Sequence, residues 1–285
     1  MNSIGNTLQG MKERMEANKE LSRKREEEYY ESGFIQLPLW REEKRGAPNS
    51  FLRSALFAAI QSKDRADMKR AKLFSQQGIT IIYSGQQLNQ EDMTVWLSLV
   101  DLAKEHPLGT ECNFTAHSIL KYMGAGVGGK DHERLSATID RMTGCLIKVE
   151  GERYIFGGSL IDSFVIDKET KQYKVKLNRH LIKLFGENDW TAIDWEERKQ
   201  LKGKPLALKL HDYYSSHENP KPVTIEFLSS ITGSKNSQLK DVRRKVKVAL
   251  EELVKIGFLK RYDIEENLVK VVRVPKPHRL INNGV

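Results

Sequence analysis

The sequence is poor in cysteine, since Cys112 and Cys145 are the only two among 285 residues. Two cysteines cannot form the framework of a small disulfide-rich protein, and they suit a reducing cytoplasm. No run of 18 apolar residues occurs, which excludes a membrane-spanning helix of the usual length. The first residues show no basic segment followed by an apolar stretch, so no secretory signal is visible. We therefore expect a soluble cytoplasmic protein.

Positive charge is in excess, with 47 Lys and Arg against 38 Asp and Glu, a formal net charge of +9. The excess is concentrated at one end of the chain. Residues 234–285 hold 13 basic and 6 acidic residues, whereas residues 1–48 hold nine of each. A charge that served solubility alone would be spread more evenly. The concentration indicates a localised surface for an anionic partner, and nucleic acid is the first partner to consider.

Length and pattern divide the chain into three parts: an N-terminal arm over 1–48, a first unit over 49–185 and a second unit over 186–285. In the second unit the pattern predicts a helix over 206–214, a short helix over 224–231, a long helix stopped by Gly257, and a β-hairpin over 258–274. The first unit fits the same order with extra strands. We therefore expect an α+β protein with two tandem winged-helix domains.

The long helix of the second unit is the principal candidate for DNA binding. Its apolar stripe, which we expect in the core, consists of Leu239, Val242, Val246, Leu250 and Leu253. The opposite face is basic, and a major groove admits one such helix. The candidates for base reading are Asn236, Ser237, Lys240 and Arg244, and those for phosphate contact are Arg243, Lys245, Lys247, Lys260 and Arg261. Lys235, at the N-terminal end of the helix, is a further DNA-binding candidate.

The first unit carries a thinner basic face on Lys130, Arg134 and Arg141, for which we expect contacts with the DNA backbone. The alternative for both faces is an ordinary solvated helix surface, which is what most charged runs are. The order of elements and the one-sided basic excess favour DNA binding.

The glycine-rich segment Gly124–Lys130 satisfies two nucleotide-binding patterns, G-x-G-x-x-G and G-x-x-x-x-G-K. Asp131 follows the lysine where a P-loop needs Ser or Thr, and the preceding residues have helical spacing. We expect a turn between two helices. His106, Cys112 and His117 lack the partners of a zinc motif, so we predict no metal and no cofactor. No nucleophile–base pairing has a local signature, and we predict no enzymatic activity.

Several short segments make the chain resemble the TrfA-type plasmid replication initiators, which bind repeated origin sequences called iterons. The segments that carry the resemblance are Arg53–Phe57, Val95-Trp96 after Gly85 and Leu88, Tyr214–His217, and the helix end from Glu251 to Gly257. The resemblance implies a tandem winged-helix fold in which the second domain reads the iteron and the first adds backbone contacts. It also implies a monomer–dimer equilibrium, origin melting, and recruitment of host replication proteins, among them the replicative helicase and the host initiator.

The same resemblance suggests a function for a short apolar segment in the arm, residues 36–40, which we call the apolar island. Gln36, Leu37, Leu39 and Trp40 look like the short Gln-Leu-x-Leu-aromatic peptide with which such initiators bind the host sliding clamp. Trp40 departs from the commoner phenylalanine. The alternative is a strap that packs these apolar side chains on the first unit.

Three other functions compete with the initiator. A winged-helix transcriptional regulator would share the DNA-binding surface and need not exclude initiation. A nucleotide-dependent enzyme would use the turn at Gly124–Lys130. A host-factor adaptor would act mainly through the arm.

Overall fold

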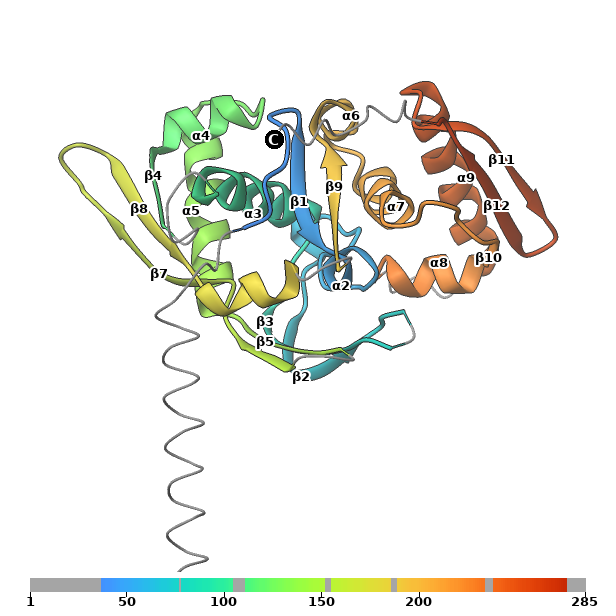
Figure 1. Ribbon diagram of the computed structural model, residues 1–285, viewed down its shortest axis with the longest axis horizontal. Helices are drawn as coiled ribbons and strands as arrows, with labels where there is room; N and C mark the ends of the chain where they lie inside the picture. Colours follow the sequence, from blue (N-terminus) through green and yellow to red (C-terminus); the bar gives the residue numbers. More distant parts are fainter. Residues whose placement is uncertain are drawn as a thin grey trace, which may run out of the picture.

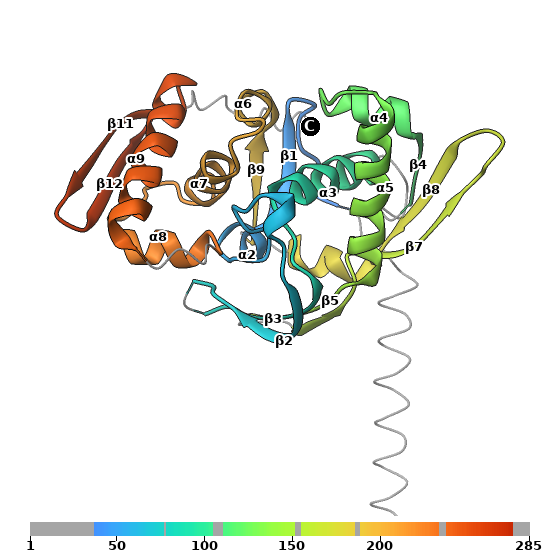
Figure 2. The same cartoon turned by 180° about the vertical axis from the view of Figure 1, so that it is seen from behind.

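The computed structural model describes residues 37–76, 78–104, 111–151, 155–185, 189–233 and 238–275 (Figures 1 and 2). Helices and strands are mixed throughout, as the α+β expectation requires. The buried side chains form two hydrophobic clusters, one drawn from residues between Leu37 and Trp195 and the other from residues between Leu201 and Val269. Within the described residues, no helix is both long and apolar enough to cross a membrane.

The first unit is built around three helices and a β-hairpin. Its elements are α3 (Gln90–Ala103), β4 (Glu111–Thr115), α4 (Ala116–Tyr122), α5 (Gly129–Gly144), β7 (Ile161–Ile166) and β8 (Gln172–Leu177). The three strands form an antiparallel sheet in the order β4-β8-β7. At the start of α4 the Thr115 hydroxyl accepts a hydrogen bond from the Ser118 N–H at 3.1 Å, so Thr115 is the N-cap of this helix.

A second antiparallel sheet is attached to this unit. Its strands are β2 (Asp67–Leu73), β3 (Thr80–Gln86), β5 (Leu146–Glu150) and β6 (Ile155–Gly158), in the order β2-β3-β5-β6. The strands β5 and β6 are inserted between α5 and the hairpin β7–β8. They account for the extra strands that the sequence predicted in the first unit.

The second unit repeats the order of the first more compactly. Its elements are α7 (Pro205–Ser215), β10 (Val223–Thr224), α8 (Ile225–Ile231), α9 (Leu239–Lys255), β11 (Leu259–Glu265) and β12 (Leu268–Arg273). Thr224 caps α8 as Thr115 caps α4, since its hydroxyl accepts from the Phe227 N–H at 3.1 Å. Gly257 ends α9 with a φ of +78°, a conformation that favours glycine.

The two units share their topology as well as their order of elements. In each, the strand before the short helix pairs with the second strand of the hairpin, giving β4-β8-β7 in one and β10-β12-β11 in the other. The long helices also bury side chains at one spacing. Leu135, Thr138, Ile139 and Met142 of α5 are buried, and so are Val246, Ala249, Leu250 and Leu253 of α9. This common spacing aligns the two helices residue by residue.

Strands from distant parts of the chain lie between the two units. β1 (Lys44–Pro48) pairs with β9 (Trp190–Asp194), and Figures 1 and 2 show this ribbon between α5 and α9. Residues 44–48 were expected in the arm and β9 in the second unit. In the structure, Ala47 and Ile193 of this ribbon are buried in the same hydrophobic cluster as the core of the first unit. Smaller elements nearby are α2 (Asn49–Leu52), the 3-10 helices η1 (Ser62–Asp64) and η2 (Arg179–Phe185), and α6 (Trp195–Gln200).

Buried polar contacts hold the two units against one another. The Lys209 ammonium of α7 is buried and donates to the carbonyl oxygens of Leu52 at 3.2 Å and of Ser54 at 2.5 Å. Burial lowers the pKa of Lys209 to about 8. The Arg198 guanidinium of α6 donates to the Asp212 carboxylate of α7, and both side chains are almost fully buried. The relative placement of the units is therefore fixed by specific hydrogen bonds as well as by apolar packing.

Candidate nucleic-acid interface

Helix α9 has one apolar side and one basic side. Its buried residues are Val242, Val246, Ala249, Leu250 and Leu253, and three residues per two turns on one face is the usual pattern of a helix that covers a core. Leu239 differs from the expectation, because 48% of its surface is exposed. It is the first residue of α9, where fewer core side chains reach it.

The basic side of α9 is open. Lys240, Arg244, Lys245 and Lys247 are all exposed. The side chain of Arg244 is 72% exposed, and its acidic neighbour is Asp241, with 3.9 Å between the guanidinium nitrogen and the carboxylate oxygen. Such a distant exposed pair contributes little attraction in water. The Arg244 guanidinium can therefore turn toward an incoming ligand.

A groove runs between α9 and the hairpin β11–β12. Six basic residues line it, together with the apolar and polar side chains of Val254, Tyr262 and Ile264, and Asp263 is the acidic residue in its lining. The basic residues are Lys240, Arg243, Arg244 and Lys247 from α9 and Lys260 and Arg261 from β11. Like charges gathered along a concave surface concentrate a positive potential there, which attracts a polyanion such as the DNA backbone.

Arg243, for which the sequence predicted a phosphate contact, lines this groove and also contacts the hairpin. Its guanidinium reaches the turn of the hairpin and donates to the carbonyl oxygens of Ile264, at 3.2 Å, and of Glu266. Glu266 has a φ of +48° in this turn. Arg243 therefore ties the hairpin to α9 and sets the width of the groove between them. Three other predicted contacts, Lys235, Asn236 and Ser237, lie outside the described residues.

The first unit presents a smaller basic surface. Lys130 and Arg134 of α5 are exposed, and the Arg134 guanidinium lies 3.6 Å from the Asp131 carboxylate. When α5 is aligned with α9 through the buried positions, Glu133 takes the place of Arg244, and Arg134 that of Lys245. The face of α5 that corresponds to the open basic side of α9 therefore carries one basic and one acidic residue.

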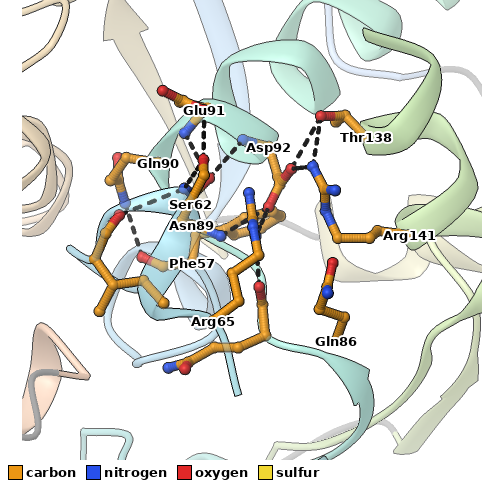
Figure 3. A network of polar contacts seen from close by, with 12 residues as sticks. Phe57, Ser62, Arg65, Gln86, Asn89, Gln90, Glu91, Asp92, Thr138 and Arg141 are labelled. Atoms are coloured by element: carbon orange, nitrogen blue, oxygen red, sulfur yellow. Dashed lines mark hydrogen bonds and ion pairs between the residues drawn. The ribbon is translucent and has the colours of Figure 1, made fainter. Parts of the chain in front are cut away.

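Arg141, the third residue predicted for DNA contact in the first unit, is engaged inside it (Figure 3). Its guanidinium donates to the Asp92 carboxylate at 2.7 Å and to the Thr138 hydroxyl at 2.8 Å. Asp92 is fully buried, and Arg65 binds its other carboxylate oxygen at 2.5 Å. A buried carboxylate needs such partners to offset the loss of its hydration. Arg141 therefore stabilises the first unit and is not presented to a phosphate.

The glycine-rich segment is a turn between α4 and α5, as expected. The Asp131 carboxylate accepts a hydrogen bond from the Gly128 N–H at 3.2 Å, at the start of α5. It also lies close against Gly126, where an added Cβ would approach its oxygen to 2.5 Å. A nucleotide phosphate would need this position at the helix N-terminus. The carboxylate that occupies it repels phosphate, and this geometry weighs against the nucleotide-dependent enzyme.

The apolar island at the end of the arm packs on the first unit in the manner of a strap. Leu37 and Trp40 are buried in its cluster, whereas Leu39 is 77% exposed. The Trp40 ring stacks on Phe185, with 6.2 Å between ring centroids, and its indole N–H donates to the Asp101 carboxylate at 2.5 Å. Gln36 lies outside the described residues. A clamp-binding peptide made of these residues would first have to leave this packed position.

Of the residues considered for a metal, Cys112 is buried, His117 is exposed, and His106 lies outside the described residues. Burial raises the pKa of the Cys112 thiol to about 12 and that of Cys145 to about 11, so both stay protonated at neutral pH. Among the described residues, no group of three or more His, Cys, Asp and Glu side chains could hold a metal ion.

Comparison with known proteins decides the family. The family model described as TrfA protein matches residues 16–273, most of the chain. The chain belongs to the TrfA family. A curated TrfA-family relative, the plasmid replication initiator protein TrfA of Escherichia coli, is 27% identical over 242 residues. That match covers 82% of this chain and 63% of the relative, so the chain spans less than two thirds of the relative's length.

The chain was also compared with solved structures of other proteins. Domains 2 and 3 of RctB superpose with a TM-score of 0.54 at 11% sequence identity, over 80% of this TrfA-family chain and 98% of that chain. A crystal structure of the Pi initiator protein in complex with iteron DNA gives a TM-score of 0.46 at 12% identity, over 67% of this chain and 97% of that chain. The likeness to RctB shows that the mixed helix and sheet fold is shared.

Proposed function

We propose that this TrfA-family chain is a plasmid replication initiator that binds iterons, with α9 as the helix that reads the DNA sequence. The observation that carries the proposal is the groove between α9 and the hairpin β11–β12, lined by six basic side chains and bordered by an open basic helix face. The name of the curated relative, a plasmid replication initiator, supports the same function. We expect the chain to act by binding DNA and not as an enzyme.

The geometry of α9 divides its basic residues into two kinds. Lys240 and Arg244 lie on the side of the helix away from the core, where a helix seated in the major groove meets base edges. Lys245 lies to one side of this line, Lys247 continues the line farther from the helix N-terminus, and Lys260 and Arg261 extend from the hairpin. Base contacts come from the N-terminal part of a recognition helix, and side chains beside or beyond that part meet phosphates, so we assign these four to backbone contact.

We further propose that both units are winged-helix domains. In each, a helix, a short strand, a short helix, a long helix and a hairpin follow one another, and the short strand pairs with the hairpin. This is the order and pairing of a winged helix-turn-helix. The exposed Lys130 and Arg134 then give the first unit backbone contacts, while the recognition of sequence falls to the second.

The family resemblance implies further partners, which are predictions for this chain. The partners are the host sliding clamp, the replicative helicase and the host initiator. The resemblance also implies origin melting and a monomer–dimer equilibrium. Of these predictions, the packing of the strap affects only the one on the sliding clamp. Leu37 and Trp40 are buried, and a clamp-binding peptide would need both side chains exposed.

Selection of bound duplexes from a random-sequence pool tests the proposed function. We expect the recovered sequences to match a motif that recurs as direct repeats beside an A·T-rich segment in the DNA near the coding gene. A motif that occurs once, at the promoter of the gene, would identify a transcriptional regulator instead. Recovery of no common motif by the protein would overturn sequence-specific binding, and with it the initiator.

A further inference from the structure

The segment Lys199–Lys204 runs from the last residues of α6 to the residue before α7. Its side chains reach the turn before α5 at one end and α9 at the other. The Lys202 ammonium donates to the Gly124 carbonyl oxygen at 2.8 Å, and the stem of Lys199 also lies beside Gly124. The Lys204 ammonium pairs with the Glu252 carboxylate of α9 at 2.5 Å. Six residues thus span from one unit to the other, and three of the six are lysines.

These lysines join the basic residues of the two helices into one band. Lys199 and Lys202 line a common depression with Arg134 of α5. Lys204 lines a groove with Arg244 and Lys245 of α9. Arg134 and Lys245 occupy equivalent positions when the helices are aligned through their buried residues. The segment therefore lies along the same flank of both long helices and fills the space between their basic side chains.

The charge of this segment is directed outward. Two side chains just before the segment turn inward instead, where Arg198 pairs with Asp212 and Glu197 contacts His211 at 2.9 Å. Lys199 is about one third exposed and pairs with the exposed Glu196 at 2.5 Å, while Lys202 is exposed. Each lysine uses one contact within the protein, and an ammonium has three donors. Donors therefore remain for an anion outside.

We propose that Lys199 and Lys202 form a third DNA-contact element, which binds the phosphates between the stretches of duplex that α5 and α9 meet. This inference rests on the proposed function, because it requires both helices to lie on one duplex. Two helices in successive major grooves are about one helical turn, roughly 34 Å, apart. The minor groove faces the protein between them, and its phosphates are the acceptors nearest to a segment that joins the two helices.

The test is the salt dependence of binding to two duplexes, one recovered by selection and one of mixed sequence with equal length. In the double variant Lys199→Gln/Lys202→Gln, the slope of log affinity against log salt should become less steep by about 1.8, since each phosphate contact contributes about 0.9. The ratio of affinities for the two duplexes should stay unchanged, because phosphate contacts carry no sequence information.

The matched control replaces two lysines with the same spacing on another face. Lys69→Gln/Lys72→Gln removes two exposed charges from β2, which lies on the opposite side of the molecule from α6 in Figure 1. The control should leave the slope unchanged. If both double variants reduce the slope equally, the effect is one of net charge and the proposal is overturned.

A conservative variant separates charge from structure. Lys199→Arg/Lys202→Arg keeps both charges and should retain the wild-type slope, whereas an equal loss in the Arg and Gln variants would mean that the lysines only support the fold and would refute the proposal. An unchanged slope in the Gln variant also refutes it. If Arg244→Ala still reduces sequence discrimination in that case, the proposed function stands. If the wild-type chain binds neither duplex, the proposed function fails as well.

Discussion

The long helices α5 and α9 have the same setting but different exposed faces. Each follows a short helix capped by a threonine, and each precedes a hairpin. The four buried side chains of α5 match four of the five buried side chains of α9 in spacing. On the exposed side they diverge. α9 contains six basic and three acidic residues, and α5 contains three of each. Glu133 and Asp140 of α5 stand where α9 has Arg244 and Glu251.

The difference shows that two units with the same fold can differ in function through their exposed residues. The buried spacing is under the same constraint in both units, because a helix of either unit must cover a hydrophobic cluster. The exposed positions carry no such constraint, so the two copies could acquire different charges. Arg141 and Arg244 illustrate the outcome. The first is held by a buried carboxylate, and the second is 72% exposed.

The largest expected effect concerns Arg141. Arg141→Leu should lower the free energy of unfolding by about 3 kcal/mol, because it removes a partner of the buried Asp92 carboxylate. The urea midpoint of the purified variant measures this. Glu252, its counterpart on α9, makes a surface pair with Lys204, so Glu252→Gln should leave the midpoint nearly unchanged. Equal midpoints for Arg141→Leu and the wild type would show that Arg141 has no structural role.

The next effect distinguishes the two exposed faces. Arg244→Ala should weaken binding to a selected duplex by about 1–3 kcal/mol and reduce discrimination against mixed sequence. Glu133→Ala changes the equivalent position of α5 and should not weaken binding, because it removes a negative charge from the side that faces DNA. Fluorescence anisotropy at fixed salt measures both. If the two variants lose equal affinity, the helices do not divide reading from backbone contact.

The sequence predicted the elements well where apolar spacing is decisive. The helix over 224–231 and the hairpin over 258–274 lie within a few residues of α8 and of β11 and β12. Strand pairing between distant segments was not visible, because nothing local in residues 44–48 indicates that they pair with β9. For the same reason, the sequence did not show that Ile193 of β9 packs with the core of the first unit.

The candidate site shows a similar limit. Exposure of Arg244 and Lys247 follows from helical periodicity and was predictable. Arg141 is hydrogen-bonded to Asp92, which is 49 residues away in the chain, and Arg243 is hydrogen-bonded to the hairpin turn. Neither contact was predictable from the sequence. A charged side chain on an expected helix surface can form an ion pair or hydrogen bond with a residue far away in the sequence. Only the folded structure shows which charged side chains do so.

The smallest expected effect separates two neighbours on α9, Arg243 and Lys247. Lys247→Gln removes an exposed charge from the groove and should reduce the salt slope of binding by about 0.9, the value for one phosphate contact. Arg243→Gln should change the slope less, because that guanidinium is bound to the carbonyl oxygens of Ile264 and Glu266. It should instead free the hairpin from α9, and faster amide hydrogen exchange in β11 and β12 would show this. If Arg243→Gln matched Lys247→Gln in slope and left the exchange unchanged, Arg243 would be a phosphate contact after all. Helix α9 would then have one more DNA-binding charge than the present assignment gives it, and the difference between α9 and α5 would be larger.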